Sequence, residues 1–294
     1  MNRRTFLTTT AAAFEARTFA AEAPKKRKLK KAINLAMFKA PEASLVDRCK
    51  MIRDAGFEGI ELHLPGSESL DELLKARDAS GLEFAGGMCA THWKSPLSAT
   101  DPAVVEAGMR GLKLALSQAG ELGCREMLLV PGVVKEDVTY ELCWQRSIEQ
   151  IKRAIPEAEK AKCRICVENV WNQFITKAEE AVRFVDEIGS PWVGWHLDYG
   201  NLVTWGQTAE HWTRTLGRRV YNLHIKDFSN AKKEAEGERK GFAVELGEGS
   251  NDWPAIMKAL DEIGYEGYGI LEVPGGDAAR VKFLAERTDK LFAG

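Results

Sequence analysis

Short apolar runs, rich in β-branched residues, alternate with longer stretches of helical period along most of the chain. The first apolar run covers residues 32–38, and the stretch over residues 44–55 places apolar side chains on one face behind an N-capping Ser44. Strands that alternate with helices in this way are typical of βα units built on a parallel sheet.

The alternation continues to the end of the chain and gives eight pairs of elements. Strands are expected over residues 32–38, 59–64, 83–90, 126–130, 164–170, 193–197, 220–225 and 268–273. Helices are expected over residues 44–55, 69–79, 101–123, 139–162, 177–188, 208–216, 252–263 and 277–292, with a polar insertion at residues 229–245. This count predicts a single (β/α)8 TIM barrel. A doubly wound open sheet is the alternative, but no G-x-G-x-x-G fingerprint follows the first strand.

The first 30 residues differ from the rest of the chain. The run Asn2-Arg3-Arg4-Thr5-Phe6-Leu7 resembles a twin-arginine export signal, and small residues follow it. The basic stretch that follows, residues 25–31, is predicted to be a solvated linker. We therefore expect export to the periplasm, with the cytoplasm as the alternative, and a catalytic barrel over residues 31–294.

Composition and charge exclude several classes of protein. The chain has 294 residues, 45% of them hydrophobic, and 41 Lys plus Arg against 43 Asp plus Glu. There is no basic excess for nucleic acid and no run of about 20 apolar residues for a membrane span. Six cysteines do not make a disulfide framework in a chain of this length. Cys163 and Cys166 have C-x-x-C spacing, but without a second pair we expect buried apolar residues rather than a zinc site.

Ionisable residues stand at the ends of the last four predicted strands, where the active site of such a barrel lies. They are Glu168, Asp198, His224 and Glu272, separated by 30, 26 and 48 residues. The first two intervals each match one βα unit, and the third is one unit plus the polar insertion. The four side chains are therefore expected to converge above one part of the rim.

Three carboxylates and one imidazole form a mixed oxygen and nitrogen ligand set. Such a set suits a divalent ion, with Mn²⁺ expected and Mg²⁺, Co²⁺ or Zn²⁺ as alternatives. Any one of the four residues could instead be structural, for example a buried carboxylate paired with a lysine. Four such groups on successive strands are costly to bury unless a shared cation neutralises them together.

Longer motifs carry a resemblance to a known family. They are Val167-Glu168-Asn169, Leu197-Asp198-Tyr199-Gly200-Asn201, His224-Ile225-Lys226-Asp227, the segment at residues 247–253, and Gly264-Tyr265-Glu266-Gly267 leading to Glu272. In order and spacing these resemble the sugar phosphate isomerase/epimerase superfamily of xylose isomerase-like barrels, which includes ketose 3-epimerases, hydroxypyruvate isomerase and inosose dehydratase. The resemblance covers residues 32–292.

The resemblance implies a metal held by Glu168, Asp198, His224 and Glu272, with the two glutamates also acting as the acid and base. A divalent ion that chelates the substrate carbonyl and a neighbouring hydroxyl stabilises the enediolate formed when the α-proton leaves. Returning the proton to the opposite face gives an epimerase, and returning it to the adjacent carbon gives an isomerase. The implied partner is a small sugar or keto-sugar, and the family favours a dimer or tetramer.

Six further residues on the predicted rim are candidates for binding substrate. His63 ends the second strand, His92 and Trp93 follow the third, and Trp171 follows the fifth. Asn201 stands where several epimerases of the family carry a histidine. Lys226 could neutralise an oxyanion or a phosphate, or form an ion pair with Asp227 or another neighbour.

Three other functions are compatible with parts of the pattern. A lyase or hydrolase acting on keto-sugars or glycosides would use the same metal site. A non-catalytic sugar-binding barrel would not need both glutamates. An apurinic-site endonuclease uses a similar barrel, but it needs histidines that this chain lacks and a positive surface for DNA.

Overall fold

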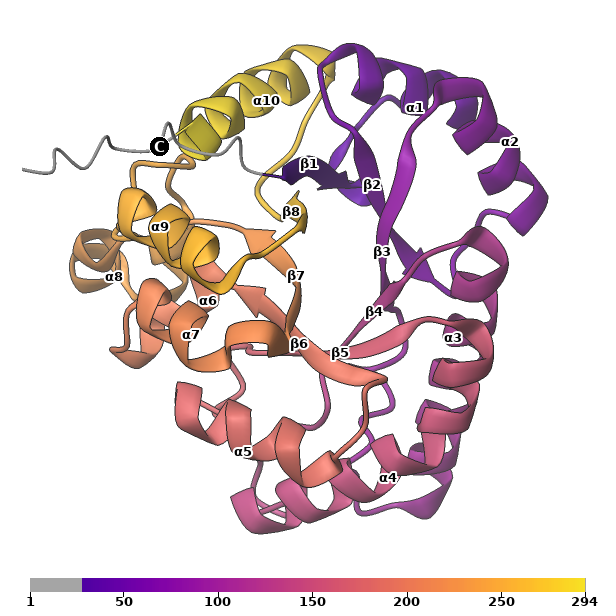
Figure 1. Ribbon diagram of the computed structural model, residues 1–294, viewed down its shortest axis with the longest axis vertical. Helices are drawn as coiled ribbons and strands as arrows, with labels where there is room; N and C mark the ends of the chain where they lie inside the picture. The colour runs from indigo at the N-terminus through magenta and orange to yellow at the C-terminus, as the bar shows by residue number, and fades with distance from the viewer. Residues whose placement is uncertain (1–27, 294) are drawn as a thin grey trace, which may run out of the picture.

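Parallel strands close into a barrel in the order β1 to β8, and the main helices surround it (Figure 1). This computed structural model describes residues 28–293, so residues 1–27 of the predicted signal and linker lie outside it. Closure is direct, because Ile33 of the first strand pairs with Ile60 on one side and with Leu271 of the last strand on the other. The predicted (β/α)8 barrel is confirmed, and the open sheet is excluded.

Strands and helices alternate along the chain as predicted. The strands are β1 (Leu29–Asn34), β2 (Gly59–Leu64), β3 (Glu83–Cys89), β4 (Glu126–Leu129), β5 (Arg164–Glu168), β6 (Val193–Asp198), β7 (Val220–Ile225) and β8 (Gly267–Leu271). The helices are α1 (Leu45–Asp54), α2 (Leu70–Ser80), α3 (Pro102–Leu122), α4 (Tyr140–Ala161), α5 (Ala178–Ile188), α6 (Tyr199–Leu202), α7 (Ala209–Leu216), α8 (Asn230–Glu236), α9 (Trp253–Ile263) and α10 (Ala278–Ala293).

The first strand begins three residues and ends four residues earlier than the apolar run suggests. Residues Leu35–Met37, expected to be extended, form a 3-10 turn. Asn34 explains this, because its side chain accepts a hydrogen bond from the backbone of Ala36 at 3.0 Å and turns the chain. Leu29 and Lys30, assigned to the linker by composition, belong to the strand.

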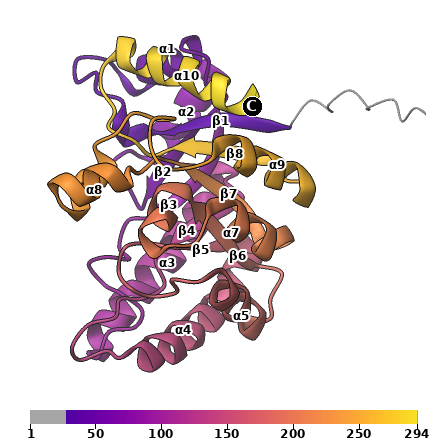
Figure 2. The same cartoon turned by 90° about the vertical axis from the view of Figure 1, so that its left-hand side faces the viewer.

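The fifth and eighth strands end earlier than predicted, at Glu168 and Leu271. The insertion before α9, expected only as polar chain, contains α8 and a 3-10 helix over Glu238–Phe242. Figure 2 shows α8 on the side of the barrel toward which β1 runs, beyond the carboxyl ends of the strands. The insertion therefore adds to the face on which an active site is expected.

Both faces of the sheet are buried, as a parallel sheet covered by helices requires. All six residues of β6 are buried, and the core between the sheet and the helices includes Trp195 and Trp212. All six cysteines are free and buried, which confirms their prediction as apolar residues. Within residues 28–293, no helix has the length and apolar composition needed to cross a bilayer.

Candidate metal centre

The last four strands deliver the predicted ionisable side chains to one place. Glu168 and Asp198 are the final residues of β5 and β6, His224 is the penultimate residue of β7, and Glu272 follows β8 directly. Asp198 pairs in register with His224, which brings the two side chains to the same height. One ligand atom from each of the four residues lies within 4.8 Å of the others.

The imidazole of His224 stands at the centre of the cluster. Its Nδ1 lies 3.1 Å from Glu168 Oε1, 3.7 Å from Asp198 Oδ2 and 3.6 Å from Glu272 Oε2. The side chains of Asp198 and His224 are fully buried, whereas that of Glu272 is 27% exposed. The cluster is therefore closed toward the barrel interior and open to solvent on the side of Glu272.

Lys226 supplies a positive charge to the cluster. Its Nζ lies 2.7 Å from Asp198 Oδ2 and 2.5 Å from Glu272 Oε2. The lysine thus pairs with two of the predicted ligands, and Asp227, the partner considered from sequence, is engaged elsewhere. These two carboxylates hold the pKa of Lys226 above its usual range, although burial alone would lower it.

Burial and charge shift the carboxyl groups in opposite directions. Burial raises the pKa of Glu168 to about 7, an effect that its contact with His224 only partly offsets. Burial would also raise the pKa of Asp198 and of Glu272, but Lys226 and His224 outweigh it and hold both below their usual value. Separate environments therefore distinguish carboxylates that share one site.

The residues present fit a divalent ion. Asp198 Oδ2 is buried and makes no well-directed hydrogen bond, despite the ammonium group of Lys226 nearby, so a lone pair remains available. Three carboxylates and one imidazole are ligands of Mn²⁺ and Mg²⁺. Glu168, Asp198, His224 and Glu272 would hold the ion.

The predicted substrate-binding residues fall into two groups. His63 is exposed at the end of β2, where its Nε2 lies 3.1 Å from Asn34 Nδ2. Trp93 and Trp171 are 43% and 58% exposed and stack on each other, with ring centroids 5.5 Å apart and 13° between the planes. These three side chains remain accessible to a ligand.

His92 and Asn201 are buried and engaged with the protein. His92 Nδ1 accepts a hydrogen bond from the backbone of Val130 at 3.1 Å, and burial lowers the pKa of its imidazole to about 4. The Asn201 amide donates to the carbonyl of Asn169 at 3.0 Å, and its backbone N–H donates to Asp198 at 2.8 Å. In this structure both side chains support the loops around the cluster.

Sequence reasoning did not single out the residues that fix these loops. Asn169 joins β5 to β6: its Nδ2 donates to the carbonyl of Asp198 at 2.9 Å, and its Oδ1 accepts from the Asp198 N–H at 3.2 Å. Asp227 accepts hydrogen bonds from the backbones of Gly247 and Gly249 and from Trp253 Nε1 at 3.0–3.1 Å. Their positions beside Glu168 and Lys226 in the quoted motifs were the available signal.

Glu61 was also missed. It lies in the middle of β2, inside the barrel, and both of its carboxylate oxygens are 3.2 Å from His224 Nε2. A glutamate in the centre of a predicted barrel strand is the signal that could have identified it, because such positions are normally apolar or functional.

Fold and site together define a class of protein: a (β/α)8 barrel with three carboxylates and one imidazole gathered at the carboxyl ends of its last four strands. A family model described as the xylose isomerase-like TIM barrel matches residues 49–290. The chain belongs to this family, which confirms the resemblance seen in its motifs.

Curated relatives match this chain over most of its length. L-ribulose-5-phosphate 3-epimerase UlaE of Escherichia coli is 21% identical over 242 residues, covering 78% of this chain and 81% of the relative. Inosose dehydratase of Clostridium perfringens is 24% identical over 233 residues, covering 74% and 78%.

Solved structures show the same fold at low identity. A D-psicose 3-epimerase solved in the presence of D-fructose superimposes with a TM-score of 0.75 at 19% identity, covering 90% of this chain and all of the other. The 3-keto-D-glucoside 4-epimerase YcjR of Escherichia coli gives a TM-score of 0.74 at 15% identity, covering 92% and 100%. Sugar epimerases thus recur among the relatives and neighbours, in agreement with the prediction of an isomerase-class enzyme.

Proposed function

We propose that this protein is a divalent-metal-dependent sugar isomerase or epimerase that removes a proton from the carbon next to a carbonyl. The observation that carries the proposal is the convergence of Glu168, Asp198, His224 and Glu272, with ligand atoms within 4.8 Å of one another. We propose Mn²⁺ as the resident ion and the periplasm as the site of action, reached through the twin-arginine-like signal.

The two glutamates are the proposed acid and base. An ion bound at the cluster would act as a Lewis acid on the substrate carbonyl and acidify the neighbouring C–H. Glu272, on the solvent-exposed side of the cluster, and Glu168, buried within it, can then take and return the proton. Return to the other face of the same carbon inverts it, and return to the adjacent carbon exchanges aldose and ketose.

Other side chains are proposed to hold the sugar. The stacked pair Trp93 and Trp171 offers aromatic surface for the apolar face of a sugar ring. Trp171 follows Glu168 by three residues, so its Cα lies within about 11 Å of the Cα of Glu168. His63 and Lys226 carry polar atoms that can meet hydroxyl or oxyanion groups.

A lyase acting on a keto-sugar or keto-glycoside is the second candidate. It begins with the same proton removal and ends with loss of a β-substituent. The similarity to inosose dehydratase favours this alternative, and the similarity to a 3-keto-D-glucoside 4-epimerase supports a keto-glycoside as the class of substrate. Product analysis separates the two activities, because only the lyase releases a leaving group.

Exchange of substrate hydrogen with D₂O tests the proposal directly. The Mn²⁺-loaded protein is incubated with a panel of ketoses and 3-keto sugars, and deuterium next to the carbonyl is measured by NMR. We expect incorporation with at least one sugar, lost in both Glu168→Gln and Glu272→Gln. A protein that binds a sugar but exchanges no hydrogen across the panel would be a binding barrel and would refute the proposal.

A further inference from the structure

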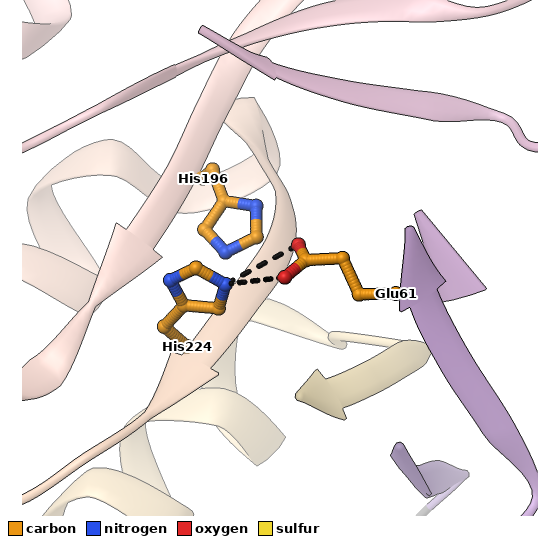
Figure 3. Close-up of side chains that lie close together, drawn as sticks. All are labelled: Glu61, His196 and His224. Carbon is orange, nitrogen blue, oxygen red and sulfur yellow. Dashed lines mark hydrogen bonds and ion pairs between the residues drawn. The ribbon is translucent and has the colours of Figure 1, made fainter. Parts of the chain in front are cut away.

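Glu61 lies inside the barrel on the closed side of the metal cluster, where an unpaired carboxylate is expensive. Its side chain is fully buried, and its Oε2 accepts a hydrogen bond from Asn34 Nδ2 at 2.7 Å. Among residues 28–293, no lysine or arginine lies within 4.0 Å of it. Its ion-pair partner is His224, whose Nε2 lies 3.2 Å from both carboxylate oxygens (Figure 3). Because burying a carboxylate in this way costs free energy, we expect Glu61 to have a role that offsets the cost.

The two nitrogens of His224 face different groups. Nδ1 faces Glu168, Asp198 and Glu272, and Nε2 faces Glu61. An imidazole that gives its Nδ1 lone pair to a cation carries its proton on Nε2. A carboxylate at Nε2 accepts that proton in a hydrogen bond, fixes the tautomer and increases the basicity of the ligand nitrogen.

His196 completes this arrangement on β6. Its ring packs edge-on against His224, with centroids 4.1 Å apart and 68° between the planes, and its buried Nε2 has no hydrogen-bond partner. Figure 3 shows both imidazoles side by side, opposite the Glu61 carboxylate. The neighbouring ring restricts rotation of His224, while the carboxylate sets its direction.

We infer that Glu61 is a positioning residue that orients His224 and holds the tautomer needed for coordination through Nδ1. The inference rests on the proposed function, because it assumes an ion at the cluster above. Glu61 acts through His224 and touches neither substrate nor metal.

The same three residues could instead bind a second ion, since ligand atoms of Glu61, His196 and His224 lie within 4.8 Å of one another. Geometry favours the positioning role. A second ion would require His224 to coordinate through both nitrogens at once. All three side chains are also buried, so bulk solvent does not reach them to supply the water ligands that complete a coordination sphere.

Metal affinity of two variants tests the inference without any turnover. Glu61→Leu removes the acceptor and the charge, and Glu61→Gln keeps an acceptor oxygen without the charge. Mn²⁺ binding is titrated by EPR and calorimetry. We expect a loss of affinity of about 10- to 100-fold in Glu61→Leu and a smaller loss in Glu61→Gln. Glu126→Gln is the matched control, because Glu126 is another carboxylate on a barrel strand, at the opposite end of the sheet.

A second readout separates orientation from simple loss of folding. Nitrogen-15 NMR of the Mg²⁺-loaded protein should show His224 coordinated through Nδ1 with its proton on Nε2 in the wild type, and a population of His224 rings whose Nδ1 is released from the ion in Glu61→Leu. Unfolding curves in chelator identify the temperature at which each variant is folded for titration. If Glu61→Leu fails to fold, the titration of Glu61→Gln decides.

Each result has a distinct meaning. Wild-type affinity and a wild-type tautomer in a folded Glu61 variant would overturn the positioning role and leave the proposed function standing. Two ions per wild-type chain, with one lost in the variants, would also overturn it in favour of a second ion site. Failure of the wild type to bind Mn²⁺ would reject the proposed function itself.

Discussion

Replacement of Lys226 by methionine tests whether an ion and the lysine neutralise the same carboxylates. The ammonium group lies 2.7 Å from Asp198 and 2.5 Å from Glu272, on a side chain that is 16% exposed. Methionine retains most of the aliphatic volume and removes the charge. In chelator, the three carboxylates of the cluster then share only the charge of His224, which also pairs with Glu61.

The size of the effect follows from the burial of these groups. Breaking a buried ion pair costs about 3–5 kcal/mol when one partner remains uncompensated. Glu272 is 27% exposed, which lowers the expected loss below that range, to about 2–3 kcal/mol in the free energy of unfolding. A divalent ion at the same oxygens restores the missing charge. The stabilisation by saturating Mn²⁺ should therefore be about 2 kcal/mol larger in Lys226→Met than in the wild type, or roughly 30-fold in affinity.

Urea unfolding in EDTA and in MnCl₂ measures this difference, and calorimetry measures the affinity. Lys258→Met is the control, since Lys258 is exposed on α9 and should leave both quantities unchanged. If Mn²⁺ stabilises Lys226→Met no more than the wild type, the lysine and the ion do not share ligands, and the electrostatic argument is wrong.

Two further predictions concern the rim and the far end of the barrel. Trp171→Ala should raise KM for the sugar about 2- to 10-fold with little change in kcat, because it removes stacking worth about 0.5–1.5 kcal/mol. The control Phe283→Ala, on the exposed face of α10, should leave KM unchanged. An unchanged KM for Trp171→Ala in steady-state kinetics would show that the tryptophan pair does not bind the sugar. Burial raises the pKa of Glu126 to about 7. Between about pH 4.5 and 7 the folded state therefore binds more protons than the unfolded state, so the stability of the fold falls as the pH rises and stays reduced above pH 7. Glu126→Gln should therefore stabilise the protein by about 1–3 kcal/mol at pH 8, allowing for the lost contact with Arg164, and by little at pH 4.5. Urea unfolding measures both values, and a gain in the free energy of unfolding that does not depend on pH would contradict the argument.

Most of the fold could be predicted from hydrophobic period alone. Buried strands and amphipathic helices differ in period, so the order of elements was evident, and β2 and β7 have the predicted bounds. The predicted end of a strand was wrong where a side chain forms a hydrogen bond with the backbone in place of a neighbouring strand. Asn34 ends β1 by accepting from Ala36, and the apolar residues that follow gave no sign of this.

The cluster could be predicted because its members stand at strand ends, and barrel topology brings those ends together. Supporting contacts depend on register and side-chain direction, which the period does not give. Glu61 is 163 residues from His224 in the chain, and their contact exists only because the barrel closes. Trp93 and Trp171 could be placed on the rim, but their mutual stacking required the loop conformations.

Titration of the metal-free protein with Mn²⁺ tests the central claim most directly, with bound and free ion distinguished by EPR. The account predicts one saturable ion per chain in the wild type and loss of that binding in Asp198→Asn and His224→Ala. Equal binding in the wild type and in these two variants, or no saturable binding at all, would contradict it.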